Sequence, residues 1–157
     1  MRAATARFVE VDQDSPVAET ALTHYFDELN ARFPQGFDPG APDADPGAPD
    51  AEPGACYVAA LNDGEPVAYG GIRPLETADT AEIKRMWVDS GWRGAGLGGR
   101  MLRHLEVLAR DRGFSWIRLD TNGTLVEAIA MYERAGYTRI DRYNDNPYAQ
   151  LFFEKRL

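Results

Sequence analysis

The sequence predicts an α/β protein of the α+β kind, with a mostly antiparallel sheet, one parallel junction and flanking helices. Three observations support this fold class. The apolar periodicity indicates elements in the order strand, helix, three strands, helix, strand, helix and two strands. A hairpin signal at Asp63-Gly64 makes two consecutive strands antiparallel. A glycine loop and an amphipathic helix form a crossover that joins parallel strands near residues 88 and 115.

The first strand is expected at residues 4–12, where the residue types alternate and favour a strand. Ser15 and Pro16 follow, and they provide an N-cap and a first-turn proline for a helix that runs to about Phe33. Its apolar stripe has spacings of three and four residues and consists of Ala18, Leu22, Tyr25, Phe26 and Leu29. This spacing is typical of an amphipathic helix with one buried side.

Residues 38–55 interrupt the pattern with a short repeat. The heptapeptide DPGAPDA at 38–44 recurs at 45–51, and EPGA follows at 52–55. Seven residues are too few for a solenoid unit, and proline, glycine and aspartate favour an irregular chain. We therefore expect a low-complexity loop insertion within a single domain that spans residues 1–157.

The remaining elements follow closely on one another. Beyond the hairpin strands CYVAAL and PVAYGGIRPL, we expect strands at 81–88 and 115–120, helices at 98–112 and 124–136, and final strands YTRI and AQLFFEKRL. Gly113 and Gly136 each come directly after a predicted helix, where a left-handed residue commonly ends it.

Charge is distributed unevenly. The chain has a net charge of −8, which argues against a nucleic-acid partner. Residues 82–118 nevertheless carry eight Lys or Arg against four Asp or Glu, so an anionic ligand is expected at the glycine loop within them. Arg103, Arg110 and Arg112 are equally well explained as solvated helix charges.

Other classes of function are disfavoured by composition. No stretch approaches the roughly 20 apolar residues that span a bilayer, so no membrane partner is expected. The single cysteine, Cys56, cannot form an internal disulfide, which fits a cytoplasmic location. Two histidines and one cysteine lie far apart in the sequence, so no metal cofactor is expected.

The loop GWRGAGLGGR at 91–100 satisfies two patterns for binding a pyrophosphate. Gly94, Gly96 and Gly99 fit the dinucleotide fingerprint G-x-G-x-x-G, whereas Arg93, Gly96 and Gly98 fit R-x-x-G-x-G. In either case the glycines allow successive N–H groups to point inward, and the following helix adds the positive end of its dipole.

The position of the loop argues against a dinucleotide. Five residues separate Val88 from Gly94, whereas the fingerprint normally follows its strand almost directly. Only 37 residues follow Asp120, where a ribose-binding acid would stand, and these cannot complete a doubly wound sheet. The strands before the loop form a hairpin and do not supply the missing half either.

Three segments together resemble the GNAT superfamily of N-acetyltransferases. They are AEIKRMWV at 81–88, the R-x-x-G-x-G loop and EAIAMYERAGY at 127–137, in this order with a strand between the last two. The resemblance implies a mixed sheet that is splayed at the central parallel pair, between its fourth and fifth strands. Acetyl-CoA, with coenzyme A as its carrier, would lie in this split.

The resemblance also implies which residues bind the coenzyme. The loop would hold the pyrophosphate with Arg93, Gly94, Ala95, Gly96, Leu97, Gly98 and Gly99. The edge formed by Met86, Trp87 and Val88 would bind the pantetheine arm, and Asn122 and Tyr132 would close the other side. Gly99 is also expected to provide packing space in the first turn of the helix.

Two residues are candidates for catalysis. Tyr132 matches the position where the family often carries the tyrosine that protonates the leaving thiolate, and a phenol with a pKa near 10 suits that role. A core aromatic is the alternative. Glu82 stands where some members carry a general base, and strand alternation predicts that it shares a face with Lys84, Met86 and Val88. An ion pair with Lys84 or Arg85, or a solvated position at the start of the strand, is the alternative for Glu82.

The acceptor pocket is expected near the aromatic segment RYNDNPYA at 142–149, with Tyr143, Asn144 and Tyr148 as substrate-binding candidates. A loop stabilised by Asn and Asp turns explains the same residues equally well.

The predicted function is acetyl transfer to a primary amine of a small molecule or peptide, by direct attack in a ternary complex. A non-catalytic acyl-CoA-binding sensory module of the same fold is the alternative. Homodimers are common in the family, so self-association is a further expectation.

Overall fold

The computed structural model describes residues 6–38, 54–77 and 79–157, so most of the predicted loop insertion at 38–55 lies outside the described residues. The predicted order of elements is confirmed. The elements are β1 (Arg7–Val11), α2 (Pro16–Arg32), β2 (Cys56–Asn62), β3 (Glu65–Pro74), β4 (Thr80–Val88), α3 (Leu97–Asp111), β5 (Trp116–Thr121), α4 (Val126–Arg134), β6 (Thr138–Ile140) and β7 (Leu151–Arg156). A single 3-10 turn, Ser90–Trp92, links β4 to the glycine loop.

Local signals set several of these boundaries. Ser15 caps α2 by accepting a hydrogen bond from the N–H of Ala18 at 3.2 Å, and Pro16 occupies the first turn. Asp63 and Gly64 have φ angles of 50° and 81°, the two positive values that a tight hairpin turn requires between β2 and β3. None of the described helices is long and apolar enough to cross a membrane.

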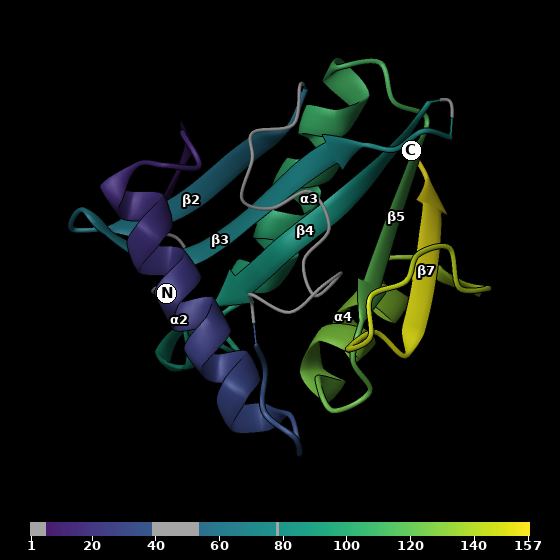
Figure 1. Ribbon diagram of the computed structural model, residues 1–157. Coiled ribbons are helices and arrows are strands. Elements are labelled where there is room, and N and C mark those ends of the chain that lie inside the picture. Colours follow the sequence, from purple (N-terminus) through teal and green to yellow (C-terminus); the bar gives the residue numbers. More distant parts are fainter. Residues whose placement is uncertain (1–5, 39–53, 78) are drawn as a thin grey trace.

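The described residues form one seven-stranded sheet in the order β1-β2-β3-β4-β5-β7-β6, in which only the β4–β5 pair is parallel. Helix α2 packs on one face of the sheet and α3 on the opposite face (Figure 1). Helix α4 lies on the same side as α3, because its apolar residues join the same core. The sheet therefore has a helical layer on each face.

The parallel pairing is short. It joins Thr80, Ala81 and Glu82 to Trp116, Ile117 and Arg118, after which the strands diverge (Figure 1). The parallel contact thus lies at the beginning of β4 and not near residue 88, because the strands are already apart when β4 ends. The splay expected between the fourth and fifth strands is present.

A β-bulge interrupts β4 just beyond the last parallel pair. Gly71 pairs with Lys84 and Tyr69 with Trp87, so Arg85 and Met86 together oppose one residue of β3. Arg85 has a φ of 56°, which lies in the left-handed region. Because of the extra residue, each later side chain of β4 points to the opposite face of the sheet from the one that strict alternation predicts.

The bulge makes one prediction wrong. Ile83 and Met86 both pack in the core beneath α3, which strict alternation could not produce. Glu82 therefore lies on the α2 face, whereas Met86 and Val88 lie on the α3 face. Glu82 and Met86 do not share a face, because alternation is reset at Arg85.

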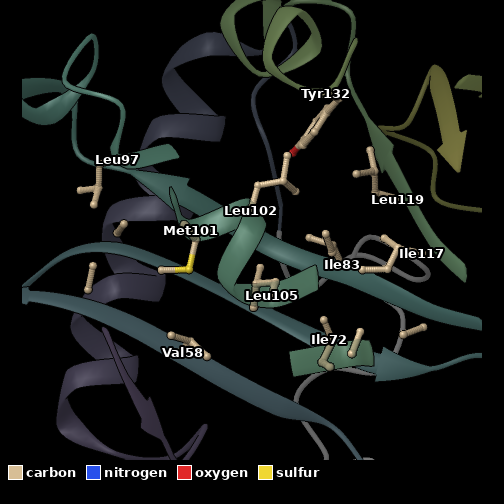
Figure 2. Packing of buried hydrophobic residues seen from close by; sticks show 14 of the residues in the cluster. Val58, Ile72, Ile83, Leu97, Met101, Leu102, Leu105, Ile117, Leu119 and Tyr132 are labelled. Carbon is tan, nitrogen blue, oxygen red and sulfur yellow. The ribbon is translucent and has the colours of Figure 1, made fainter. Parts of the chain in front are cut away.

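The larger core lies between α3 and the sheet. Its fully buried side chains include Val58, Ile72, Leu97, Met101, Leu102, Leu105, Ile117 and Leu119 (Figure 2). The smaller core lies beneath α2, where Ala18 and Ala21 let the helix approach Tyr57, Tyr69 and Trp87. Tyr57 and Tyr69 stack with a centroid distance of 5.7 Å.

Gly71 gives a test of this packing. A Cβ atom added there would lie 2.4 Å from Cδ1 of Tyr57 and 3.1 Å from the carbonyl oxygen of Cys56, neither of which can easily move. We expect Gly71→Ala to lower the free energy of unfolding by about 2–3 kcal/mol, measured by urea denaturation. Gly70→Ala is the matched control, since its Cβ would lie 3.0 Å from the end of the Leu105 side chain and no closer than 3.8 Å to Met101 or to the backbone of Met86. Equal losses in the two variants would contradict the Tyr57 contact.

Candidate functional site

Two cavities meet where β4 and β5 diverge. The larger has a volume of about 560 Å³, within the range of small-molecule sites, and the smaller about 90 Å³. Six residues line both: Tyr25, Leu29, Met86, Leu125, Ala128 and Tyr132. Because they share this wall, a molecule in one cavity can approach a molecule in the other.

The glycine loop lines the larger cavity at the start of α3. The φ angles of Gly94 and Gly96 are both 81°, a conformation that favours glycine. The first backbone hydrogen bond of the helix runs from the N–H of Arg100 to the carbonyl of Gly96, at 3.1 Å. The N–H groups just before it belong to the helix end that has no intrahelical acceptor. This combination suits a bound anion.

Close packing in this region involves Gly98. An added Cβ would lie 2.9 Å from Sδ of Met131 and 3.5 Å from Cγ2 of Val88, so its absence lets α3 approach α4 and β4. At Gly99 a Cβ would meet only the guanidinium of Arg103, at 3.4 Å. The packing space predicted for Gly99 therefore belongs to its neighbour.

Most of the predicted coenzyme-binding residues lie together. The larger cavity is lined by Met86, Trp87, Val88, Arg93, Gly94, Gly96, Leu97, Gly98, Gly99 and Tyr132. Ala95 packs against the core and is not part of this lining. Asn122 lines the smaller cavity, and its side chain donates to the carbonyl of Tyr148 at 2.7 Å and accepts from the N–H of Thr124 at 2.9 Å. Asn122 thereby holds two chain segments together.

Arginines surround the larger cavity. Arg93 forms an ion pair with Glu28 of α2, and Arg32 pairs with Glu127 of α4 at 2.7 Å. Arg103 and Arg134 also line the cavity. The cluster of positive charge in the sequence included Arg103, but Arg134 lies outside that cluster and sequence reasoning missed it.

Tyr132 lies at the junction of the cavities. Its ring is buried against Tyr137 and Phe153, and its hydroxyl points toward Leu102 (Figure 2). Among the described residues, none forms a hydrogen bond with this hydroxyl. Burial, and secondarily the negative charge of Asp120, raise the pKa of Tyr132 well above that of a free phenol, so the group stays protonated at neutral pH.

Glu82 is buried, with 2% of its surface exposed, and both of its carboxylate oxygens are bound. Arg73 donates to one oxygen at 2.8 Å, and the hydroxyl of Tyr143 donates to the other at 2.6 Å. The ion-pair partner is Arg73 because the antiparallel register places it directly opposite on β3. Glu82 also lines the smaller cavity.

The predicted acceptor residues take different places. Tyr148 lines the smaller cavity, and its ring lies 4.7 Å from Phe37 and 5.6 Å from Phe33 between centroids. Tyr143 and Asn144 are not part of the lining. Their side chains donate to acidic groups from behind the cavity wall, Tyr143 to Glu82 and Asn144 to Asp120 at 2.6 Å. The loop also contains the Asn turn foreseen as the alternative, since Asn144 accepts from the N–H of Asn146 at 3.0 Å.

Sequence reasoning missed other residues of the smaller cavity. Asp120 and Asn146 supply polar groups there, and Phe26, Phe33 and Phe37 supply aromatic ones. The sequence offered one signal for Asp120: it is the last residue of a predicted strand that borders the split. Among the described residues no group of three or more His, Cys, Asp or Glu side chains is arranged to hold a metal ion.

Comparisons with known proteins agree with this geometry. Residues 22–137 match the model of the acetyltransferase (GNAT) family. The uncharacterized N-acetyltransferase YjgM of Escherichia coli K12 is 32% identical over 132 residues, which cover 82% of this chain and 79% of the relative. A GNAT-family acetyltransferase structure from Staphylococcus aureus has a TM-score of 0.76 at 18% identity, covering 96% of this chain and 98% of that one.

A second solved structure shares the fold. A GNAT-family acetyltransferase from Elizabethkingia anophelis, with acetyl-CoA bound, has a TM-score of 0.65 at 12% identity and covers 98% of this chain and 99% of that one. At these identities, both structural likenesses concern the fold alone.

The buried ion pair can be tested by stability. Arg73→Gln leaves the carboxylate of Glu82 buried without its cation, and we expect the free energy of unfolding to fall by about 3 kcal/mol in urea denaturation. The double variant Arg73→Gln, Glu82→Gln should recover most of the loss, because no charge is then buried unpaired. Arg112→Gln is the control, since that arginine makes an exposed ion pair of 3.7 Å with Glu10 and should cost little. A loss at Arg73 no greater than that at Arg112 would contradict the importance of the pair.

Proposed function

The chain belongs to the acetyltransferase (GNAT) family, and we propose that it transfers an acetyl group from acetyl-CoA to a primary amine of a small molecule or peptide. The observation that carries this proposal is the glycine cradle at the start of α3, which opens into a cavity that reaches the split between β4 and β5. An anionic carrier bound at the cradle would extend toward Tyr132, where the second cavity begins.

The residues present fit acetyl-CoA. Gly94, Gly96 and the first turn of α3 offer N–H groups to a pyrophosphate, and the arginines of the rim offer positive charge. Beyond Glu82, no described strand pairs with the edge of β4 that faces β5, so Met86 to Val88 are available to the amide groups of a pantetheine arm. Bound acetyl-CoA supplies an acetyl group activated as a thioester.

We assign the general acid to Tyr132. Its pKa is raised, so the phenol retains its proton at neutral pH, and its hydroxyl is free of partners among the described residues. A phenol in this position can donate to a thiolate leaving through the junction of the cavities. The same low-polarity surroundings would raise the basicity of the thiolate, which favours the transfer.

Two cavities that share a wall support direct attack in a ternary complex. The acceptor amine would occupy the smaller cavity and the thioester the larger, so that they meet at Met86 and Tyr132. The alternative is a non-catalytic acyl-CoA sensor. Such a sensor would need the cradle, but it would not need a second cavity lined by carboxylates. The cytoplasmic location and the homodimer expected from the sequence stay predictions.

Tyr132→Phe separates the enzyme from the sensor. The ring contacts persist and only the hydroxyl, with its acidic proton, is lost, so we expect kcat to fall about 10²-fold or more while the Kd for CoA changes little. A free-thiol assay with acetyl-CoA and a panel of amines measures the first, and calorimetry the second. Tyr137→Phe is the matched control, because that hydroxyl donates to Glu106 at 2.8 Å and lines neither cavity. Unchanged turnover in Tyr132→Phe would overturn the acid role, and CoA binding without turnover of any amine by the unaltered protein would favour the sensor.

Gly98→Val tests the position of the coenzyme. The new side chain would collide with Met131 and enter the cavity wall, and we expect CoA to bind about tenfold more weakly or worse, measured by calorimetry. Gly99→Ala is the comparison, since its Cβ meets only a flexible guanidinium and should change the affinity much less. Circular dichroism verifies that both variants are folded. Equal effects of the two substitutions would contradict the close packing at Gly98.

A further inference from the structure

A second carboxylate, Asp120 of β5, lies at the split. Ile117 and Leu119 of the same strand are in the core beneath α3, so alternation places Asp120 on the opposite face, which is also the face of Glu82. Asp120 lines the smaller cavity together with Tyr132. It therefore adjoins the space in which an acceptor would meet the thioester.

The two carboxylates have different partners. Glu82 is bound by the guanidinium of Arg73 and the hydroxyl of Tyr143, which together satisfy both oxygens. In the part of the chain that the structure describes, Asp120 accepts only from neutral amides, Asn144 at 2.6 Å and Asn146 at 3.4 Å. Within the described residues, no lysine or arginine forms an ion pair with Asp120. A buried carboxylate without a cation is costly, and a cationic ligand would remove that cost.

We propose that Asp120, rather than Glu82, binds the ammonium group of the acceptor and takes its proton. This proposal rests on the acetyl transfer proposed above and names the residue and substrate class of its acceptor site. Glu82 then has a positioning role: through Tyr143 and Asn144 it holds the loop that presses amides against Asp120.

Charged and titratable groups from β4, α4 and the loop with Tyr143 lie near Asp120. From β4 come Glu82, whose charge raises the pKa of Asp120, and Lys84, whose charge lowers it. Tyr132 of α4 and Tyr143 of the loop face it as neutral phenols.

The pKa of Asp120 is set mainly by its burial. Burial is the largest influence and raises its pKa above that of an ordinary aspartate, against the lowering effect of the hydrogen bond from Asn144. Of the other cations nearby, Arg73 is held by Glu82, and Arg85 lies over the ring of Tyr57 at 5.8 Å. The raised pKa makes Asp120 a stronger base than a solvated aspartate.

The far wall of the smaller cavity indicates the acceptor class. It consists of Phe26, Phe33, Phe37 and Tyr148, whose rings pack on one another at centroid distances of 4.7 to 5.9 Å. Aromatic faces favour an apolar body and also attract an ammonium group. The acceptor is therefore a primary amine carried on a compact apolar or aromatic body.

The proton balance follows from these positions. The ammonium gives one proton to the Asp120 carboxylate, and the freed nitrogen lone pair forms the new C–N bond to the acetyl carbon. The C–S bond breaks as its electron pair passes to sulfur, and Tyr132 protonates the thiolate. The nitrogen then loses a second proton, which passes through solvent to the Tyr132 oxygen and restores the phenol. Asp120 releases its own proton to solvent, so that one proton is produced per turnover.

The test uses 2-phenylethylamine and acetyl-CoA, with kcat/KM measured from pH 6 to 10. We expect Asp120→Asn to lose about 10²-fold at pH 7, and the loss to shrink toward pH 10, where the amine is neutral in solution and needs no base. The acid limb of the unaltered enzyme, which reports Asp120, should be absent from the variant. Glu82→Gln should keep the acid limb, moved to lower pH because the charge of Glu82 no longer raises the pKa of Asp120.

Other outcomes overturn the proposal. An Asp120→Asn variant within threefold of the unaltered enzyme at pH 7, or a Glu82→Gln variant that loses the acid limb, would assign the base elsewhere. Turnover of ethanolamine but not of 2-phenylethylamine would overturn the apolar acceptor class. Absence of turnover with every amine would instead be a failure of the proposed function, which Tyr132→Phe addresses separately.

Stability gives an independent measurement. Because burial raises the pKa of Asp120, folding loses stability as the pH rises through that pKa, and Asp120→Asn removes this loss. The melting temperature of the variant should therefore gain on that of the unaltered protein between pH 4 and 7. If the melting temperature of the variant instead fell relative to that of the unaltered protein over this pH range, the inference that Asp120 is an unpaired carboxylate would be contradicted. If the variant does not fold, Asn144→Ala serves instead, and it should move the acid limb to higher pH because Asp120 loses its main hydrogen bond.

Discussion

The parallel pairing of β4 and β5 ends after Glu82, and the site depends on this early separation. A fully paired sheet would have satisfied the backbone groups of Met86 to Val88 and closed the space beside them. The bulge at Arg85 contributes by turning Met86 and Val88 toward α3 while Glu82 stays on the α2 side. One interruption thus provides a strand edge, a cavity on the coenzyme side and a carboxylate on the acceptor side.

Helix packing brings the proposed acid to this opening. Gly98 lets α3 come close to Met131, one residue before Tyr132, so the same contact that shapes the glycine cradle also positions α4. Large core side chains of α3 then secure the arrangement from below. The anion cradle and the phenol are therefore mechanically connected, although they stand more than thirty residues apart in the sequence.

The environments of the two carboxylates suggest different roles for similar groups. Glu82 is neutralised by Arg73 and tied to the 143–146 loop, which makes it a structural anchor. Among the described residues, Asp120 is held by amides alone, and we propose that its charge meets the ammonium group of the acceptor. The ion pair between Glu82 and Arg73 helps to keep the 143–146 loop in place next to Asp120. Without that loop, the unpaired charge of Asp120 would attract water.

The sequence by itself determined the order of elements, the Asp63-Gly64 turn and the glycine loop at the start of α3, because these follow from residues that are neighbours in the chain. The acid role of Tyr132 stays a prediction. Only the tertiary structure decided which face Glu82 occupies, since no glycine or proline marks the bulge at Arg85. It also decided that Glu82 pairs with Arg73 and that, within the described residues, Asp120 forms no ion pair. Charge pairing and pKa depend on groups that meet through space, and those groups come from strands and a loop far apart in sequence.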